Sequence, residues 1–277
     1  MKVTFDSGIL FAEADTLGAE LTSIRIRGRE KLWQGSAWPH HAPILFPVCG
    51  NCDLRLNGKQ YPLERHGFAR KSEFTVLSKR KNAVCFELRS NPQTKECYPF
   101  DFCFRVTYSL RGTCLNISYE VENLGDGTMY FSCGGHESFA LERPLEDYEL
   151  QFNQEENFVH LPHDENGRLT GEQVELGSGT RLPIPPLTGG NTLILGNLRS
   201  RHVRLCEKEG RWLADISFGG FSNLLLWRVG EERMICIEPW RNLPDGTREQ
   251  EFSEKEGIIA LPPQATKKLI RKIEYLD

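Results

Sequence analysis

The chain has 277 residues, of which 39% are hydrophobic and 26% are charged, and its formal net charge is −4. This length allows one large domain or two small ones with a substantial core, and the slightly acidic charge argues against a nucleic-acid or anionic-lipid partner. No run approaches the roughly 18 apolar residues of a membrane span, and the first residues lack the apolar core of a signal peptide. We therefore expect a cytoplasmic protein that does not bind membranes.

A stretch in the middle of the chain alternates strictly between apolar and polar residues. From Phe100 to Leu110 the apolar side chains are two residues apart, and the same spacing returns from Leu115 to Val121 after a turn at Arg111-Gly112. Because successive side chains of a strand point to opposite faces, this pattern predicts a β-hairpin with one buried face. Shorter runs predict further strands at residues 20–27, 73–77, 84–89, 129–132, 148–152, 192–195, 202–207, 213–218, 223–229, 233–237, 257–261 and 265–275.

Helical periodicity is scarce along the chain. Short helical turns are plausible only at residues 36–41 and 247–254, and residues 177–190 resemble a loop rich in Gly and Pro. Many short strands with few helices between them predict an all-β protein, built as a large antiparallel β-sandwich. No linker divides the sequence, so we expect a single domain over residues 1–277.

Nine cysteines are scattered along the chain, and we expect reduced, mostly buried thiols. Cys49 and Cys52 form a C-x-x-C, a pattern that can bind zinc or exchange disulfides. Zinc would need a second ligand pair, and the sequence has no other C-x-x-C. A redox pair needs a helix N-terminus after the first cysteine, whereas the residues after Cys52 predict a strand and a turn at Asn57-Gly58. Structural thiols are the expectation, and the two functional interpretations stay open.

Two histidines have a context typical of a pocket. His66 lies in the segment Arg65-His66-Gly67-Phe68-Ala69-Arg70, and His136 directly follows Gly134 and Gly135. Glycines let a backbone bend sharply and approach its neighbours closely. An imidazole titrates near neutral pH and can therefore act as a general acid or base. The alternative for each is a core or loop histidine that only satisfies its own hydrogen bonds.

Glu238 is the carboxylate with the most unusual position. It ends the apolar run 234–237 and is followed by Pro239 and Trp240. A charge at the end of a buried strand is unfavourable unless it is paired or serves a function. Trp240 offers a flat apolar wall that suits the CH face of a sugar ring. The alternative is a carboxylate that only neutralises a neighbouring arginine, such as Arg233 or Arg241.

Several segments occur together in an order typical of one family. They are residues 18–24 (GAELTSI), 43–50 (PILFPVCG), 66–70 (HGFAR), 134–136 (GGH) and 238–240 (EPW). On these segments the chain resembles the aldose 1-epimerase (galactose mutarotase-like) proteins, and among them the LacX-like branch. The resemblance covers essentially the whole chain. It implies a β-supersandwich with an active site on a concave sheet face, and interconversion of the α and β anomers of a free aldose.

The resemblance also implies roles for individual residues. Glu238 would be the general base that takes the proton of the C1 hydroxyl, and His136 would be the general acid that protonates the ring oxygen. His66 and Arg70 would bind the sugar and stabilise charge around the ring oxygen. The carbohydrate would pack on Trp240.

Three positions depart from the family pattern. Asn51 stands where relatives often have a basic residue that contacts sugar, and Asn191 stands where we expect an aspartate that binds sugar hydroxyls. Glu137 follows the histidine where proline is common, and its charge is expected to favour the protonated imidazole of His136. These departures leave the base and the acid in place and make the sugar preference uncertain.

The sequence thus predicts an isomerase that acts on a monosaccharide as a monomer or homodimer, without metal or cofactor. No P-loop or Rossmann glycine pattern is present. One alternative is a mutarotase for phosphorylated hexoses, with Arg65, Arg70 and Arg241 as candidates for the pocket rim. A second alternative is a non-catalytic carbohydrate-binding or sensing protein of the same fold. A purely structural protein would not explain the glycine-flanked histidines and the Glu-Pro-Trp segment.

Overall fold

In a computed structural model that describes residues 1–187 and 192–276, antiparallel strands make up most of the chain. The all-β, antiparallel sandwich predicted from the sequence is confirmed. The strands are β1 (Lys2–Asp6), β2 (Leu10–Asp15), β3 (Leu21–Ile26), β4 (Arg29–Glu30), β5 (Leu54–Leu56), β6 (Lys59–Tyr61), β7 (Thr75–Arg80), β8 (Ala83–Arg89), β9 (Phe102–Arg111), β10 (Cys114–Asn123), β11 (Met129–Phe131), β12 (Glu137–Ala140), β13 (Tyr148–His160), β14 (Val174–Pro183), β15 (Leu193–Leu195), β16 (His202–Glu207), β17 (Trp212–Ser217), β18 (Asn223–Trp227), β19 (Met234–Trp240), β20 (Ile259–Leu261) and β21 (Thr266–Tyr275).

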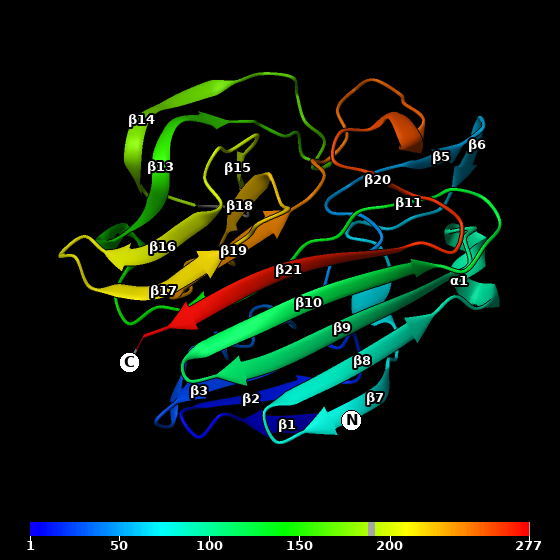
Figure 1. Ribbon diagram of the computed structural model, residues 1–277. Helices are drawn as coiled ribbons and strands as arrows, with labels where there is room; N and C mark the ends of the chain where they lie inside the picture. The colour runs from blue at the N-terminus through cyan, green and yellow to red at the C-terminus, as the bar shows by residue number, and fades with distance from the viewer. Residues whose placement is uncertain (188–191, 277) are drawn as a thin grey trace.

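One large sheet organises the molecule. Its strand order is β12-β19-β18-β15-β13-β16-β17-β21-β10-β9-β8-β7, with β14 paired to β13. Figure 1 shows β21, β10, β9, β8 and β7 side by side as long ribbons, with the first sheet, β1-β2-β3-β4, beside them. Two further pairs, β5-β6 and β11-β20, complete the strands of the described residues. The site-bearing strands β12 and β19 lie at one edge of the large sheet.

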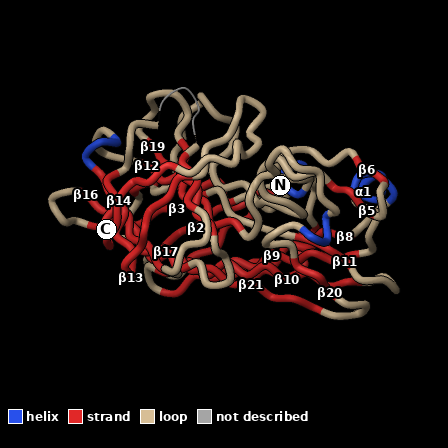
Figure 2. Tube along the Cα trace, turned by 90° about the horizontal axis from the view of Figure 1, so that it is seen from above, coloured by secondary structure: helices blue, strands red, loops and turns tan. Residues whose placement is uncertain are grey.

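The first sheet packs on one face of the large sheet, as the view from above shows (Figure 2). The ring of Phe5 stacks on that of Tyr108, with centroids 6.3 Å apart. The Tyr108 hydroxyl donates a hydrogen bond of 2.8 Å to the carbonyl oxygen of Ala19. Both rings are almost completely buried, so the core lies between the two sheets.

The central hairpin forms as the alternating pattern predicts. Strands β9 and β10 pair from Arg111 opposite Cys114 to Phe102 opposite Asn123. Their apolar side chains are at most 1% exposed from Phe102 to Leu110 and from Leu115 to Val121. Because each strand buries one face only, the polar side chains between them stay at the surface.

Helices are few, and of the two helical turns expected from the sequence one forms. The one α-helix of the described residues is α1 (Pro92–Cys97), with Asn91 as its N-cap and a reciprocal hydrogen bond between Asn91 and Thr94. Three 3₁₀ turns are η1 (Ala69–Lys71), η2 (Leu145–Asp147) and η3 (Phe252–Glu254), of which η3 lies in the expected region 247–254. Residues 36–41 form no helix. No helix of the described residues is long and apolar enough to cross a membrane.

Two segments near turns complete the comparison with the sequence. The predicted turn at Asn57-Gly58 joins β5 and β6, and both residues have positive φ, of 51° and 78°. The expected loop at 177–190 is wrong in its first half, because β14 extends to Pro183. Gly177 and Gly179 have positive φ and lie at irregularities of the β13–β14 pairing. Glycines in a strand often mark such irregularities. The glycines of β14 therefore gave this segment the composition of a loop.

Candidate active site

The pairing register of the edge strand β12 and its neighbour β19 brings the predicted acid and base together. In the β12–β19 pair, Glu137 lies opposite Ile237, and an isolated bridge places Gly134 opposite Trp240. The same register puts His136 opposite Glu238. Directly opposed residues of antiparallel strands have their side chains on the same face and close together. Residues about a hundred positions apart in the chain therefore share one site.

His136 and Glu238 are in direct contact. His136 Nε2 lies 3.2 Å from Glu238 Oε2, and the two side chains are 8% and 2% exposed. The indole Nε1 of Trp240 donates to the same carboxylate oxygen over 3.2 Å. His136 Nδ1 is buried and has no hydrogen-bond partner among the described residues. The reactive nitrogen of this imidazole is thus Nε2.

Burial opposes charge on both members of the pair. It raises the pKa of the Glu238 carboxyl well above its usual range, while the positive charge of Arg65 and the Trp240 hydrogen bond act in the other direction. Burial also lowers the pKa of the His136 imidazole well below its usual range, and Arg65 lowers it further. Two coupled groups of this kind titrate as a pair. At 3.2 Å, Nε2 of His136 and Oε2 of Glu238 are close enough for one proton to lie on either atom.

A second histidine faces the pair from another part of the chain. The ring centroid of His66 is 5.6 Å from that of His136 and 5.2 Å from that of Trp240. The backbone N–H of Gly50 donates to His66 Nδ1 over 3.0 Å, and Arg65 Nε lies 3.2 Å from His66 Nε2. Burial, together with the charges around it, lowers the pKa of His66 well below its usual range. His66 therefore favours its neutral form at the wall of the cavity.

Two guanidinium groups lie at the same cavity. Arg70 Nη2 donates to the carbonyl oxygen of Arg65 over 3.1 Å. The Nε of Arg70 is buried and has no partner among the described residues. Burial and the nearby charge of Arg65 lower the pKa of Arg70. Two like charges side by side favour a ligand with acceptor or negatively charged oxygens.

Three indoles shape the walls of the cavity. The Trp38 ring lies over His136 with centroids 4.9 Å apart, and Trp227 meets Trp38 edge-on at 5.2 Å. Trp240 forms a further wall. The cavity has a volume of about 260 Å³, a size that suits a small polar molecule. Its lining consists of Trp38, Arg65, His66, Arg70, His136, Thr192, Trp227, Glu238 and Trp240.

Glu137 lies on the other face of its strand and forms a buried ion pair there. Arg271 Nη1 and Nη2 donate to the two carboxylate oxygens of Glu137 over 2.8 Å and 2.5 Å. Arg271 Nη2 also donates to the hydroxyl of Tyr119 over 2.7 Å. The expectation that Glu137 favours protonated His136 is wrong, because the strand directs the two side chains apart and Arg271 neutralises the carboxylate. Burial instead lowers the pKa of His136.

The remaining predicted residues lie differently. The side-chain amide of Asn51 donates to the carbonyl oxygen of Asn166, away from the cavity lining. Asn191 lies outside the described residues. Arg241, named as a candidate for the rim, donates to the carbonyl oxygen of Gly220 and does not line the cavity. The predicted site omitted Trp38, Thr192 and Trp227, which nothing in the sequence beyond residue type marked, whereas Arg65, also a candidate for the rim, lines the cavity.

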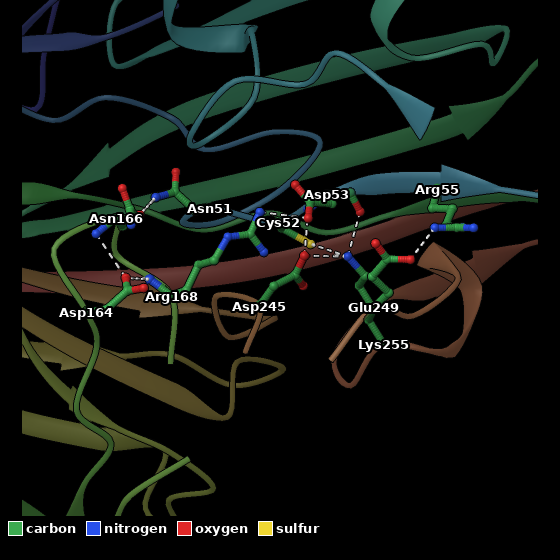
Figure 3. A network of polar contacts seen from close by, with 10 residues as sticks. All are labelled: Asn51, Cys52, Asp53, Arg55, Asp164, Asn166, Arg168, Asp245, Glu249 and Lys255. Atoms are coloured by element: carbon green, nitrogen blue, oxygen red, sulfur yellow. Dashed lines mark hydrogen bonds and ion pairs between the residues drawn. The ribbon is translucent and has the colours of Figure 1, made fainter. Parts of the chain in front are cut away.

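Cys52 of the C-x-x-C belongs to a polar network in which Asn51 also lies (Figure 3). Lys255 Nζ contacts Cys52 Sγ at 3.8 Å and Asp245 Oδ2 at 2.6 Å. Both thiols of the pair are free and buried, and burial raises the pKa of Cys49 and of Cys52. A reactive thiol needs the opposite shift. The geometry thus supports the structural interpretation of the C-x-x-C.

The site contains the elements of acid–base chemistry on a small polar ligand. A carboxylate and an imidazole meet at one point, two guanidiniums can donate hydrogen bonds, a second imidazole lies beside them, and indoles provide apolar walls. Such a combination can move protons between two atoms of one ligand. Fold and site together define a β-sandwich protein with a candidate acid–base cavity.

Comparison with known proteins identifies the family. A model of the family "Aldose 1-epimerase" matches residues 1–190. The chromosomal LacX protein of Lactococcus lactis subsp. lactis is 32% identical, over 97% of this chain and 95% of that protein. The chain therefore belongs to the aldose 1-epimerase family. The resemblance inferred from the ordered segments, including its LacX-like character, is confirmed.

Solved structures agree with this fold over the full length. A galactose mutarotase-like protein from Lactobacillus casei superposes with a TM-score of 0.93 at 28% identity, covering 100% of both chains. A galactose mutarotase related enzyme from Lactobacillus acidophilus gives a TM-score of 0.92 at 26% identity, covering 100% of this chain and 98% of the other. The supersandwich implied by the sequence resemblance is confirmed.

Proposed function

We propose that this protein is an aldose 1-epimerase that interconverts the α and β anomers of a free aldose. The observation that carries the proposal is the meeting of His136 Nε2 and Glu238 Oε2 at 3.2 Å in a cavity with indole walls. Family membership supports an isomerase that acts on sugars, and the names of the structural relatives support a hexose as its substrate.

The proposed reaction opens and closes the pyranose by two proton transfers. Glu238 takes the proton of the C1 hydroxyl while His136 gives its proton to the ring oxygen. The electrons of the O–H bond form the carbonyl at C1, and those of the broken C1–O bond stay on the new hydroxyl. Rotation about C1–C2 presents the other carbonyl face, and ring closure reverses both transfers. Each transfer contributes about 10²–10⁴-fold to the rate, and the pair ends with its single proton.

Neighbouring residues would orient the sugar between the two reactive atoms. The guanidinium of Arg70 can donate to sugar oxygens, and its buried Nε, which has no partner among the described residues, makes an added acceptor favourable. The imidazole of His66 lies at the same cavity, next to Arg65 Nε. Indole walls pack against the CH face of a pyranose. The direct contact between His136 and Glu238 would open when the sugar enters between the two atoms.

Polarimetry of freshly dissolved α-glucose and α-galactose tests the proposal. The wild-type protein should accelerate the approach to anomeric equilibrium, and Glu238→Gln should lower kcat by about 10²–10⁴-fold because the amide cannot accept the proton. Glu207→Gln is the matched control, since Glu207 is a buried strand-end carboxylate that does not line the cavity. It should keep the wild-type rate.

Sugar binding, followed by tryptophan fluorescence, separates the alternatives. If the wild-type protein binds sugar without accelerating mutarotation, and Glu238→Gln binds equally well, the protein is a carbohydrate-binding or sensing member of the family. A rate that survives Glu238→Gln would show that another group is the base.

A mutarotase for phosphorylated hexoses is the second candidate, and Arg65 with Arg70 is the observation that favours it. The pair of His136 and Glu238 holds one proton and is neutral overall, so the two guanidiniums leave the cavity positively charged. Arg241 does not contribute to this charge. Inorganic phosphate should compete with the substrate if the hexose is phosphorylated, and should leave the rate unchanged if it is not.

A cytoplasmic location and a monomeric or homodimeric state are part of the proposal. All nine cysteines are free thiols, and free thiols suit a reducing compartment. Size-exclusion chromatography with light scattering measures the oligomeric state directly.

A further inference from the structure

A buried thiol lies beside the acid–base pair. Cys236 precedes Glu238 by two residues on β19, and alternation places both side chains on the same face of the strand. One ligand atom each of His136, Cys236 and Glu238 lie within 4.8 Å of one another. The three residues are 7%, 0% and 1% exposed. The proposed sugar chemistry uses the carboxylate and the imidazole but gives the thiol no role.

The donor set and its spacing fit one class of metal ion. Nitrogen, thiolate sulfur and carboxylate oxygen are the ligands of Zn²⁺, whereas Ca²⁺ and Mg²⁺ prefer oxygen ligands alone. Two ligands at roughly 2.0–2.1 Å from a tetrahedral zinc ion lie about 3.3 Å apart, and the observed distance between His136 Nε2 and Glu238 Oε2 is 3.2 Å. The Cys236 sulfur would need to move closer by at most about an ångström, because a tetrahedral Zn–S bond of about 2.3 Å places it about 3.6 Å from the nitrogen.

Charge and access also suit a divalent cation. A thiolate and a carboxylate neutralise its two charges, and a neutral complex is the form that a buried site tolerates. The thiol proton and the proton shared by His136 and Glu238 both pass to solvent as the three ligand atoms coordinate. His136 and Glu238 line the cavity and Cys236 lies behind them, so the fourth coordination position opens toward the space that the sugar would occupy.

We propose that His136, Cys236 and Glu238 form a binding site for a thiophilic divalent cation of the Zn²⁺ class, and that the cation and the sugar exclude each other. The binding itself is independent of the proposed function, whereas inhibition of mutarotation rests on it. The cation is a competitor of the sugar, and the sugar chemistry needs no metal.

Cobalt absorption spectroscopy on tag-free, full-length protein tests the site. Co²⁺ bound to a thiolate gives a sulfur-to-metal charge-transfer band in the near ultraviolet, and the wild-type protein should develop this band with a stoichiometry of one. Cys236→Ser should lose the band and bind Zn²⁺ at least tenfold more weakly by calorimetry. Cys206→Ser is the control, because Cys206 is a buried strand thiol outside the site, and it should keep the band and the affinity.

Two outcomes would overturn the cation site. Absence of a thiolate band in the wild-type protein at saturating Co²⁺ would show that Cys236 does not coordinate, and an unchanged band in Cys236→Ser would assign it to another thiol. The sugar provides a second measurement, since saturating α-galactose should weaken Zn²⁺ binding at least tenfold.

The result can be separated from the fate of the proposed function. A thiolate band in a protein without mutarotase activity leaves the cation site in place and removes the proposed activity. Mutarotase activity without a thiolate band removes the cation site alone. When both are present, Zn²⁺ should lower the mutarotation rate of the wild-type protein, and raising the sugar concentration should restore it.

Discussion

Replacing Arg271 by methionine is expected to destabilise the protein strongly. Arg271 is 0% exposed, and its guanidinium supplies both hydrogen bonds that the structure shows to the buried carboxylate of Glu137. Each hydrogen bond to a charged group contributes about 1.5–3 kcal/mol, so two give about 3–6 kcal/mol. This agrees with about 3–5 kcal/mol for removing one partner of a buried ion pair, which leaves the other charge unpaired.

Equilibrium urea unfolding, followed by tryptophan fluorescence, measures this change. The control is Lys2→Met, which breaks an exposed ion pair of 2.7 Å between Lys2 and Glu13 and should change the free energy of unfolding by less than about 1 kcal/mol. A double variant, Glu137→Leu with Arg271→Met, should recover much of the loss because no buried charge remains.

Equal effects of Arg271→Met and Lys2→Met would refute this reasoning, since they would show that the carboxylate of Glu137 finds water or another partner when the guanidinium is absent. A double variant no more stable than Arg271→Met would show that packing, and not charge, dominates at this position.

Three further changes follow from the site. Gly135→Ala should lower the free energy of unfolding in urea by about 1–3 kcal/mol, because the added Cβ would collide with the guanidinium of Arg271. Gly127→Ala is the control and should have little effect, since no atom lies within 4 Å of its added Cβ. Because burial holds the pKa of His66 below its value in the unfolded chain, the unfolded state binds the extra proton first. Stability should therefore fall below about pH 6.5, with a contribution from His66 of at most about 1.4 kcal/mol per pH unit, and the fall should be smaller in His66→Gln. Trp240→Phe removes the indole N–H that lowers the pKa of Glu238, so the acidic limb of the pH–rate profile should move to higher pH; an unmoved limb would show that this hydrogen bond does not tune the base.

The sequence predicts those parts of the fold that depend on local alternation. The β9–β10 hairpin is an example, because a two-residue period, one buried face and a glycine at the turn are all readable within about twenty residues. Helix α1 was also readable, since Asn91-Pro92 followed by Thr94 is a start signal with a capping residue and proline at the first position. It was missed because six residues are too few to show helical periodicity.

The site depended on pairings that no local pattern contains. Alternation shows that Glu238 and Cys236 share a face of β19, but it does not show which strand lies next to β19 or in which register. The ordered family segments supplied His136 and Glu238 as partners, and the register of β12 and β19 explains their contact. The buried ion pair of Arg271 could not be predicted for a related reason. Arg271 occupies a core-facing position of β21, where the alternating pattern alone predicts an apolar residue.

The two glycines before His136 show how the backbone determines the geometry of the pair. Neither has a positive φ, so they do not provide the sharp bend that the sequence suggested. A Cβ at Gly134 would lie 2.8 Å from the sulfur of Cys49, and one at Gly135 would collide with Arg271. Both glycines therefore permit close approach from opposite sides of a strand that stays in register. Because a shift of one residue would turn His136 to the other face, the contact with Glu238 depends on two residues that contribute no side-chain atom to it.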